Sequence, residues 1–356
     1  MIPTQRESEL RAFAEAATGG VVTRLEPAAV GSSRLTLLVD VARGDGDTWE
    51  LVLRHDGGDG PLSGTDIDLA HEAVFYRALA PHAVRIPKLV AEAPDGRTLL
   101  VERARGSESL AGLSATECEA VEQDFGRALA ELHAVDPAVL ELGDVTRPKD
   151  AGDHASLDLE RWTRFLREHV PQPSRSSRLA VDWLGAHLPT TVERTVLCHG
   201  DAGIGNFLHE AGRVTALLDW EFAHLGDPLD DVAWVLVRSH VTGGDVWQAA
   251  LAAWSAQSGI PLDPGRIAYY RALVLLRMAI SCQIALAHAV RGSERDTTVY
   301  QMLLPYLGFL LPQALREAGC RDAALDRLEA EAGRELESHP VLKAVARPLV
   351  AWEPEA

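Results

Sequence analysis

Cysteine is scarce in this 356-residue sequence, and its four cysteines lie far apart: Cys118, Cys198, Cys282 and Cys320. No two of them form a Cys-x-x-Cys pair. This spacing excludes the disulfide framework of small secreted domains and suggests no zinc knuckle, so free thiols are expected. Cys198 lies in an apolar run typical of a buried strand, and we interpret it as a packing residue.

Long apolar runs are missing as well. The most apolar window, residues 272–290, is interrupted by Arg277, Gln283 and His288, which favours a buried helix over a membrane span. The first residues, Met-Ile-Pro-Thr-Gln-Arg-Glu, lack the basic start and the apolar stretch of a secretory signal. We therefore expect a cytoplasmic protein with no membrane partner.

Basic residues are few relative to acidic ones. The sequence has 34 Lys and Arg against 52 Asp and Glu, which gives a formal net charge of −18 at pH 7. Such a balance excludes the basic stripe of a nucleic-acid-binding protein, so no nucleic-acid partner is expected. The acidic surplus promotes solubility, and it would also concentrate a cationic substrate in a cleft. Both interpretations stay open.

Several catalytic signatures are absent. The sequence has no Gly-x-Ser-x-Gly elbow, no Walker A motif, no Rossmann glycine fingerprint and no His-Glu-x-x-His motif. A metal-dependent hydrolase would need clustered histidines, but His209, His224 and His240 show no ligand spacing. They are expected in loops or helices.

The informative pattern lies between residues 197 and 221. Asp201, Asn206 and Asp219 follow one another there, each near the end of a short apolar run. A phosphoryl-transfer site needs these residue types in this order. A carboxylate orients the attacking hydroxyl, and a carboxamide and a second carboxylate then hold Mg²⁺ on the nucleotide phosphates. The pattern predicts Asp201 as the catalytic residue and Asn206 and Asp219 as metal ligands.

The segment His199-Gly-Asp201, together with Asn206 and Leu218-Asp-Trp-Glu221, resembles the catalytic segment of the aminoglycoside phosphotransferase family of small-molecule kinases. Residues 226–233 and 132–136 are also similar to that family. The resemblance implies an α+β, two-lobed protein-kinase-like fold, with a small five-stranded N-lobe and a larger, mainly helical C-lobe. It also implies ATP as the phosphate donor, with GTP not excluded, and Mg²⁺ as a cofactor.

Hydrophobic periodicity divides the chain near a hinge at residues 103–107. Residues 1–105 are the predicted nucleotide-binding lobe, and residues 106–356 the predicted catalytic and substrate-binding lobe. In the first lobe we expect strands at 21–25, 35–41, 49–53, 88–93 and 98–102, and helices at 7–17 and 66–79. In the second we expect helices at 116–134, 157–168, 178–188, 228–241, 246–258, 266–290, 297–315 and 323–336.

In kinase-like folds the first lobe supplies a phosphate-covering turn and a cation. Gly31, Ser32 and Ser33 lie between two predicted strands, where backbone N–H groups can face a phosphate, although an ordinary hairpin turn gives the same pattern. Arg54 ends the third predicted strand, where protein kinases have lysine, and a guanidinium can bind two phosphate oxygens. A surface arginine at a strand end is the alternative.

The resemblance adds three residues to the nucleotide site. Glu72 corresponds to the family's ion-pair carboxylate and would orient Arg54, whereas the neighbouring His71 is interpreted as a helix-surface residue. Glu102 and Ala104, at the hinge, complete the predicted nucleotide-binding set.

Two residues of the second lobe have two interpretations each. His199 is expected to brace the loop beneath the metal-binding aspartate, and a general base is the alternative. Glu221 could reach a second metal or a cationic substrate, or it could cap the following turn. Asp227 and Pro228 are typical of a helix start, as N-cap and first helical residue, so both are expected to be structural.

The sequence therefore predicts a small-molecule kinase that phosphorylates a hydroxyl. The acceptor could be an aminoglycoside, another antibiotic, a natural-product intermediate or a hydroxylated metabolite, and fold analogy does not choose among them. Residues 53–62 are more similar to uncharacterised family members, some fused to acyl-CoA dehydrogenases, than to resistance enzymes. The alternative is a catalytically silent nucleotide-binding regulatory module. No oligomeric state is predicted.

Overall fold

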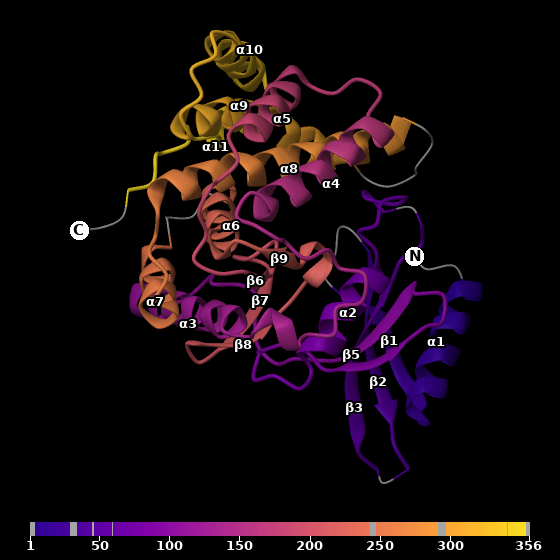
Figure 1. Cartoon of the computed structure of the whole chain (residues 1–356). Helices are drawn as coiled ribbons and strands as arrows, with labels where there is room; N and C mark the ends of the chain where they lie inside the picture. The colour runs from indigo at the N-terminus through magenta and orange to yellow at the C-terminus, as the bar shows by residue number, and fades with distance from the viewer. Residues whose placement is uncertain are drawn as a thin grey trace.

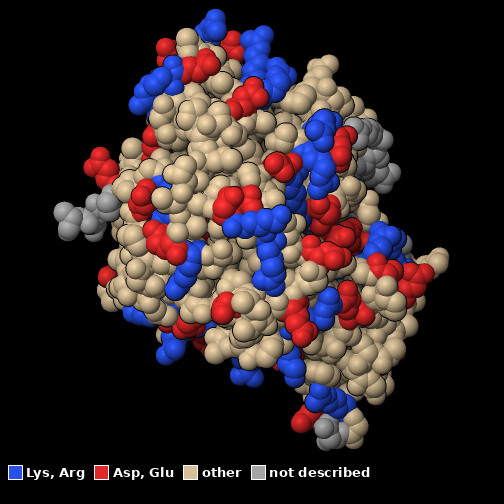
Figure 2. All heavy atoms as spheres, viewed as in Figure 1, with Lys and Arg blue, Asp and Glu red and all other residues tan. Residues whose placement is uncertain are grey.

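The chain forms two lobes, a small one around a five-stranded antiparallel sheet and a larger one built mainly from helices (Figure 1). The computed structural model describes residues 4–28, 34–44, 46–58, 60–242, 247–290, 297–339 and 341–353. On the face shown in Figure 2, Lys and Arg side chains are interspersed with Asp and Glu. The predicted α+β class, with a five-stranded small lobe, is confirmed.

The sheet of the small lobe has the strand order β1-β2-β3-β5-β4. The strands are β1 Val21–Pro27, β2 Leu35–Ala42, β3 Thr48–His55, β4 Leu89–Glu92 and β5 Thr98–Glu102. Successive residues of a strand face opposite sides of a sheet, and the apolar residues divide accordingly. Leu51 and Leu53 belong to a small core with helix α1 (Thr4–Thr18), whereas Leu99 and Val101 belong to the large core.

Helix α2, Leu69–Leu79, lies between this sheet and the large lobe (Figure 1). It begins at its N-cap Asp68, whose carboxylate accepts the backbone N–H of His71 at 2.7 Å. The helix carries Glu72 into the interior, where the residue is 0% exposed. A carboxylate buried so completely needs a cationic or hydrogen-bonding partner.

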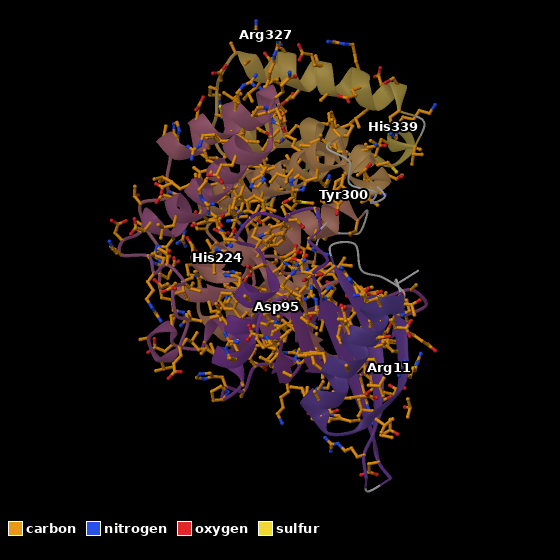
Figure 3. All side chains as sticks on the ribbon, turned by 90° about the vertical axis from the view of Figure 1, so that its right-hand side faces the viewer. Arg11, Asp95, His224, Tyr300, Arg327 and His339 are labelled. Atoms are coloured by element: carbon orange, nitrogen blue, oxygen red, sulfur yellow. The ribbon has the colours of Figure 1, made fainter. Side chains whose placement is uncertain are left out.

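Helices make up most of the large lobe, which Figure 3 shows from the side with Arg327 and His339 far from Arg11 of the small lobe. They are α3 Ala115–His133, α4 Asp153–His169, α5 Arg175–Ala186, α6 Pro228–Val241, α7 Gln248–Ser258, α8 Pro264–Val290, α9 Thr298–Glu317, α10 Ala324–Ser338 and α11 Leu342–Val345. Two short 3₁₀ turns, Pro137–Val139 and Trp220–Phe222, accompany them. Each predicted helix is present, with ends shifted by a few residues.

Helix α8 is long and apolar enough to cross a membrane, but 61% of its apolar window is buried inside the protein. It packs against α4, α5, α6 and α9. A helix that is apolar all round and surrounded by other helices is typical of the core of a large domain. The predicted buried helix is therefore confirmed.

Two short β-ribbons support the predicted catalytic segment. Strand β6 (Val196–Cys198) pairs with β9 (His224–Gly226), and β7 (Phe207–Glu210) pairs with β8 (Arg213–Leu217). Cys198 is buried in β6, as predicted. The loop that joins the two ribbons holds Asp201 and Asn206, and the turn after β8 holds Asp219.

A buried group of ionisable side chains joins α4, α6 and α8 to β9. Arg277 lies 2.5 Å from Asp158 and 2.9 Å from Asp230. The Nε2 atom of His224 lies 3.2 Å from Asp230, and its Nδ1 atom is 3.0 Å from the carbonyl oxygen of Phe222. Both ring nitrogens of His224 thus face acceptors, which favours the protonated ring because both nitrogens then donate.

The stability of the protein is expected to fall as the pH rises through the pKa of His224. Burial alone would lower this pKa, but the contact with Asp230 and the negative charges of Asp158 and Asp230 together outweigh burial and the opposing charge of Arg277, and they hold the pKa above its ordinary value. Protonated His224 therefore stabilises the fold fully below the unfolded-state pKa of about 6.5, and this contribution is lost as the pH passes the higher folded-state pKa. Urea unfolding between about pH 6 and pH 9 should show the free energy of unfolding of the native protein decreasing relative to that of His224→Gln. A difference that stays constant with pH would contradict this assignment.

Candidate active site

Helix α6 anchors the loop between β6 and β7. Asp231 of α6 accepts the backbone N–H groups of His199 and Gly200 at 2.7 and 2.8 Å. Gly200 has a φ of +80°, and a Cβ atom there would collide with the carbonyl group of Phe222. Only glycine fits this position. These contacts fix the direction in which the chain reaches Asp201.

The predicted brace by His199 is present. Its Nε2 atom donates to the carbonyl oxygen of Leu218 at 2.8 Å, directly before Asp219. Its Nδ1 atom accepts the backbone N–H of Asp201 at 3.3 Å. Burial lowers the pKa of His199, so the ring is neutral. With both nitrogens occupied, the ring supports the loop and has no nitrogen left for the proton of a substrate.

Asp201 is held from two sides. Its Oδ1 atom lies 2.5 Å from Nη1 of Arg238 on α6, and its Oδ2 atom accepts Nδ2 of Asn206 at 2.7 Å. Arg238 also donates to the carbonyl oxygen of Ile204 at 2.9 and 2.7 Å, which fixes the guanidinium against the loop. Burial raises the pKa of Asp201 above its ordinary value, although Arg238 opposes this. A raised pKa makes the carboxylate a better proton acceptor.

The β7–β8 ribbon brings Asn206 close to Asp219. Phe207 pairs with Leu217 in this ribbon, and the N–H of Leu218 donates to the carbonyl oxygen of Asn206 at 2.8 Å. Asp219 follows with a φ of +66°, in the left-handed region that aspartate and asparagine tolerate better than most residues. The two predicted metal ligands are therefore neighbours in the fold.

The donor set of this pair fits magnesium. The amide nitrogen of Asn206 donates to the carbonyl and the carboxylate of Asp201 at 2.8 and 2.7 Å, which leaves its Oδ1 atom for a cation. Asp219 adds a carboxylate. Within the described residues, no three His, Cys, Asp or Glu side chains gather into a metal cage. Mg²⁺ is usually bound by one or two side chains and completed by phosphates and water, so two oxygen ligands suit it.

Arg54 lies where the small lobe meets this pair. Its Nη1 atom contacts Glu72 of α2, as predicted, and its Nη2 atom donates to Oδ1 of Asp219 at 2.8 Å. Burial alone would lower the pKa of Arg54, but Glu72 and Asp219 raise it well above its ordinary value. Burial alone would raise the pKa of Asp219, but Arg54 outweighs it and lowers that pKa. A permanent positive charge therefore lies beside the predicted metal-binding carboxylate.

The sequence analysis did not predict two arginines of this site, Arg34 and Arg238. Arg34, in the small lobe, lies 3.3 Å from Glu72 and 2.8 Å from Glu221. The signal for Arg34 was its position directly after the predicted phosphate turn. The signal for Arg238 was its spacing seven residues after Asp231, two turns along the same face of α6.

The structure does not test the predictions for the other residues of the nucleotide site. Three of its residues lie outside the described residues: Gly31, Ser32 and Ser33. Glu102 ends β5, and Ala104 follows it in the connection between the lobes; both are partly exposed. Their roles stay predictions.

Asp227 is the N-cap of α6 with Pro228 as the first helical residue, as predicted.

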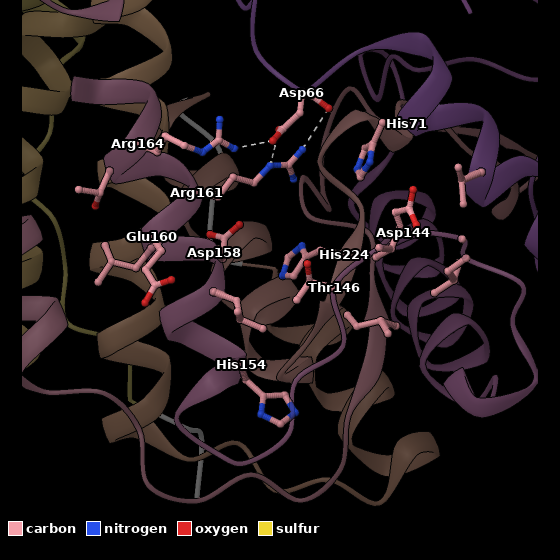
Figure 4. A pocket seen from close by; sticks show the side chains of 18 of the residues that line it. Asp66, His71, Asp144, Thr146, His154, Asp158, Glu160, Arg161, Arg164 and His224 are labelled. Atoms are coloured by element: carbon pink, nitrogen blue, oxygen red, sulfur yellow. Dashed lines mark hydrogen bonds and ion pairs between the residues drawn. The ribbon is translucent and has the colours of Figure 1, made fainter. Parts of the chain in front are cut away.

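A cavity of about 1110 Å³ lies between α2 and α4, on the side of α2 that faces away from the candidate active site (Figure 4). Asp66 spans its edge, with ion pairs of 2.7 and 2.5 Å to Arg161 and Arg164 of α4. His71, expected on the helix surface, lines this cavity and donates to the carbonyl oxygen of Ala223 at 3.1 Å, so it connects the lobes. None of the predicted catalytic or metal-binding residues lines the cavity, and it is therefore separate from the candidate active site.

The model of the phosphotransferase enzyme family matches residues 24–270 of the sequence. The chain belongs to this family. The resemblance to this family that was noted in the sequence is therefore confirmed.

Curated relatives of this chain carry two kinds of name. It is 30% identical over 187 residues to mouse acyl-CoA dehydrogenase family member 10, an alignment that covers 48% of this chain and 17% of that protein. It is 28% identical over 170 residues to Escherichia coli hygromycin-B 4-O-kinase, covering 44% of this chain and 49% of that enzyme. The chain thus spans less than half of either relative.

Solved structures share the fold of this chain. A putative aminoglycoside phosphotransferase from Ralstonia eutropha is 23% identical with a TM-score of 0.61, over 92% of this chain and 98% of that one. A choline/ethanolamine kinase family protein from Mesorhizobium loti is 19% identical with a TM-score of 0.56, over 92% and 98%. These likenesses establish the fold, and the predicted two-lobed kinase-like architecture is confirmed.

Replacing Arg54 with alanine is expected to lower kcat/KM for the nucleotide by about 10- to 100-fold, the range of a charge-assisted hydrogen bond to a phosphate. Arg54→Lys should recover part of this loss, because a point charge replaces a fork. Arg77→Ala is a matched control, since Arg77 is also in the small lobe and also pairs with one glutamate, Glu92. Steady-state kinetics with varied nucleotide make the comparison. Unchanged kinetics in Arg54→Ala would mean that another cation holds the phosphates.

Proposed function

We propose that this phosphotransferase uses ATP and Mg²⁺ to phosphorylate a hydroxyl group of a small molecule. The proposal rests on one observation: Asp201, Asn206 and Asp219 lie close together at the junction of the lobes, with Arg54 bound to Asp219. Two solved relatives add support, since one is a complex with streptomycin and ATP and another a complex with ADP and hygromycin B. No described contact distinguishes ATP from GTP.

The proposed division of labour follows from the contacts. Asn206 and Asp219 hold the metal, which when bound neutralises charge on the phosphates. Arg54, oriented by Glu72, binds phosphate oxygens from the small-lobe side. Asp201 orients the acceptor hydroxyl and accepts its proton, and in a loose transition state the orientation is the larger part of the task.

Arg238 sets the direction of the Asp201 carboxylate. It binds Oδ1 while Asn206 binds Oδ2, so the carboxylate cannot rotate without breaking one of these contacts. An acceptor hydroxyl would approach the remaining lone pairs of these two oxygens. Holding a catalytic group in one orientation lowers the entropy that the reaction must lose.

The names of the relatives define the acceptors worth testing. Hygromycin B, aminoglycosides, macrolides and choline or ethanolamine are named among them. Several curated relatives are instead named as acyl-CoA dehydrogenase family members, which adds a hydroxylated acyl thioester to the candidates. The net charge of −18 favours a cationic acceptor electrostatically, but it does not decide between these classes.

The test is a nucleotide-consumption assay against this set of acceptors. We expect formation of ADP that depends on both an acceptor and Mg²⁺, with the Asp201→Asn protein as the measure of background hydrolysis. Binding of Mg-ATP in calorimetry without turnover of any acceptor would favour the silent regulatory module. Absence of both binding and turnover would contradict the proposal.

We also propose the lobe boundary near residue 105, with nucleotide binding in residues 1–105 and catalysis and acceptor binding in residues 106–356. Action in the cytoplasm, without nucleic-acid or membrane partners, belongs to the same proposal. The mixed charges on the face in Figure 2 support the part of this proposal that concerns nucleic acid, for that face, because a nucleic-acid-binding face carries a basic stripe.

A further inference from the structure

Arg34 has contacts that the proposed chemistry does not yet use. Its side chain is 5% exposed, and it comes directly before β2, which lies between β1 and β3 in the small lobe's sheet. Its Nη1 atom lies 3.3 Å from Oε2 of Glu72 and 2.8 Å from Oε2 of Glu221. Its Nη2 atom donates to the carbonyl oxygen of Ile67 at 2.9 Å. One buried guanidinium therefore joins three separate parts of the chain.

Arg34 and Arg54 share one carboxylate. Oε2 of Glu72 faces Arg34, while Oε1 faces Arg54. Arg54 extends from there to Asp219, and Arg34 extends to Glu221. The two carboxylates of the Asp-Trp-Glu segment are thus each paired with an arginine of the small lobe. Removing one partner from such a buried ionic group leaves an uncompensated charge, so the positions of the side chains are coupled.

The position of Arg34 in the sequence shows which segments its contact with Glu221 connects. It directly follows the predicted phosphate turn, residues 31–33, and it reaches across to the turn that presents Asp219. A planar guanidinium can hold several acceptors at fixed angles, which an ammonium group cannot do. A shift of β2 at Arg34 would therefore shift Glu221 and, two residues before it, Asp219.

We propose that Arg34 is a positioning residue that couples the start of β2 and helix α2 to the Asp219-Trp-Glu221 segment and so fixes Asp219 relative to Arg54. It acts through Glu221 and Glu72 and touches no reacting atom. The inference rests on the proposed nucleotide-dependent phosphoryl transfer. It adds to that function a direct contact between the small lobe and the segment that contains the proposed metal ligand Asp219.

Arg34→Met tests the inference kinetically, because it keeps an unbranched apolar stem and removes the charge and the donors of the guanidinium. We expect kcat to fall by about 10²-fold, the usual cost of misplacing reacting groups by about 1 Å. The KM for the acceptor should change less than about twofold, since Arg34 does not touch the acceptor. Arg34→Lys should recover only part of the loss. Should Arg34→Met fail to fold, the lysine variant should still show a reduced kcat with an unchanged acceptor KM.

Arg271→Met is the matched control. Arg271 has a similar burial, with its side chain 3% exposed, and it pairs with Glu317 at 2.5 Å and with the carbonyl oxygen of Val350 at 2.9 Å. These partners lie on α9 and the C-terminal segment, away from the candidate active site. Each variant removes a buried guanidinium with its carboxylate and carbonyl contacts, two ion pairs for Arg34 and one for Arg271, so a loss of kcat confined to Arg34→Met comes from position in the site. An equal loss in both would overturn the proposal.

Glu221→Gln separates a coupled role from an independent one. If Arg34 acts through Glu221, the double variant should lose no more kcat than the more severe single variant. Losses that multiply would mean that the two side chains act independently, and the proposed coupling would be wrong.

Hydrogen exchange of the protein without nucleotide distinguishes failure of this inference from failure of the proposed function. Arg34→Met should raise the exchange of peptides covering residues 66–72 and 219–224, which its partners occupy, while Arg271→Met leaves them unchanged. If no acceptor is phosphorylated yet exchange rises in these two segments, the proposed function fails and the coupling stands. Unchanged exchange in both segments would overturn the coupling whatever the activity.

Discussion

Replacing Asp219 with asparagine is expected to abolish phosphoryl transfer, with kcat lower by at least about 10³-fold, because a bound metal supplies several kcal/mol of transition-state stabilisation. Asp219 is the charged member of the proposed metal-binding pair and also the partner of Arg54 at 2.8 Å. The substitution weakens the metal site and leaves the Arg54 charge less compensated. Both effects act on the phosphates rather than on the acceptor.

Asparagine is the better substitution here because of the backbone. Asp219 has a φ of +66°, where alanine is strained and asparagine is tolerated. A fold that survives in Asp219→Asn, measured by thermal unfolding, makes the kinetic loss interpretable. Asp219→Ala would mix the loss of a ligand with backbone strain.

Activity should be measured as a function of Mg²⁺ concentration, with and without a chelator, and Mg-dependent nucleotide binding by calorimetry. Asp40→Asn is a suitable control, since Asp40 is a partly buried carboxylate that pairs with Arg103 at 2.5 Å, outside the proposed metal-binding cluster. Full activity of Asp219→Asn, or turnover that a chelator does not reduce, would refute the metal assignment.

The parts of this site that the sequence predicts are those that local chemistry specifies. The order of Asp201, Asn206 and Asp219 already defines a phosphoryl-transfer segment, and the ribbon of β7 and β8 needs only short-range pairing to bring the last two together. Asp227 as an N-cap is equally local. These interpretations depend on neighbours within a few residues along the chain.

The parts that the sequence misses depend on tertiary contacts. Arg238 lies 37 residues from its partner Asp201, and its spacing from Asp231 gives only a helix face, not the loop that this face contacts. Helix α4 begins at Asp153 rather than near the predicted Leu157. Its first turn is held by His154, whose ring contacts the Asp150 carbonyl and Thr195. The partner at Thr195 is 41 residues away and leaves no periodic signal.

The acceptor cannot be predicted from the sequence for a related reason. The chemistry of phosphoryl transfer fixes a few residue types at fixed spacing, whereas acceptor binding depends on the shape of a surface. The family match ends at residue 270, inside α8, and the helices that follow, α9 to α11, lie beyond it. No motif in that part of the chain names a ligand.

Replacing Asp201 with asparagine is expected to lower kcat by about 10²-fold or more, the scale of a general-base contribution, while the affinity for Mg-ATP changes little. The carboxylate is the one charged group that the loop after β6 offers to an acceptor hydroxyl. Its pKa is raised by burial, with Arg238 opposing, and that makes it suited to take a proton. Asparagine keeps the size of the side chain and one acceptor oxygen for Arg238 but cannot accept the proton.

The two quantities should be measured on the same protein, kcat by steady-state kinetics and Mg-ATP binding by calorimetry. Arg238→Lys provides the comparison, because it loosens the hold on the carboxylate without removing the base; we expect a smaller loss of kcat than in Asp201→Asn. If nucleotide binding collapses together with turnover in Asp201→Asn, Asp201 is a metal ligand or a structural residue, since a base for the acceptor has no part in holding the nucleotide. If neither quantity changes, the reaction is not centred on this loop, and the contacts of Asp201 with Arg238 and Asn206 serve the fold alone.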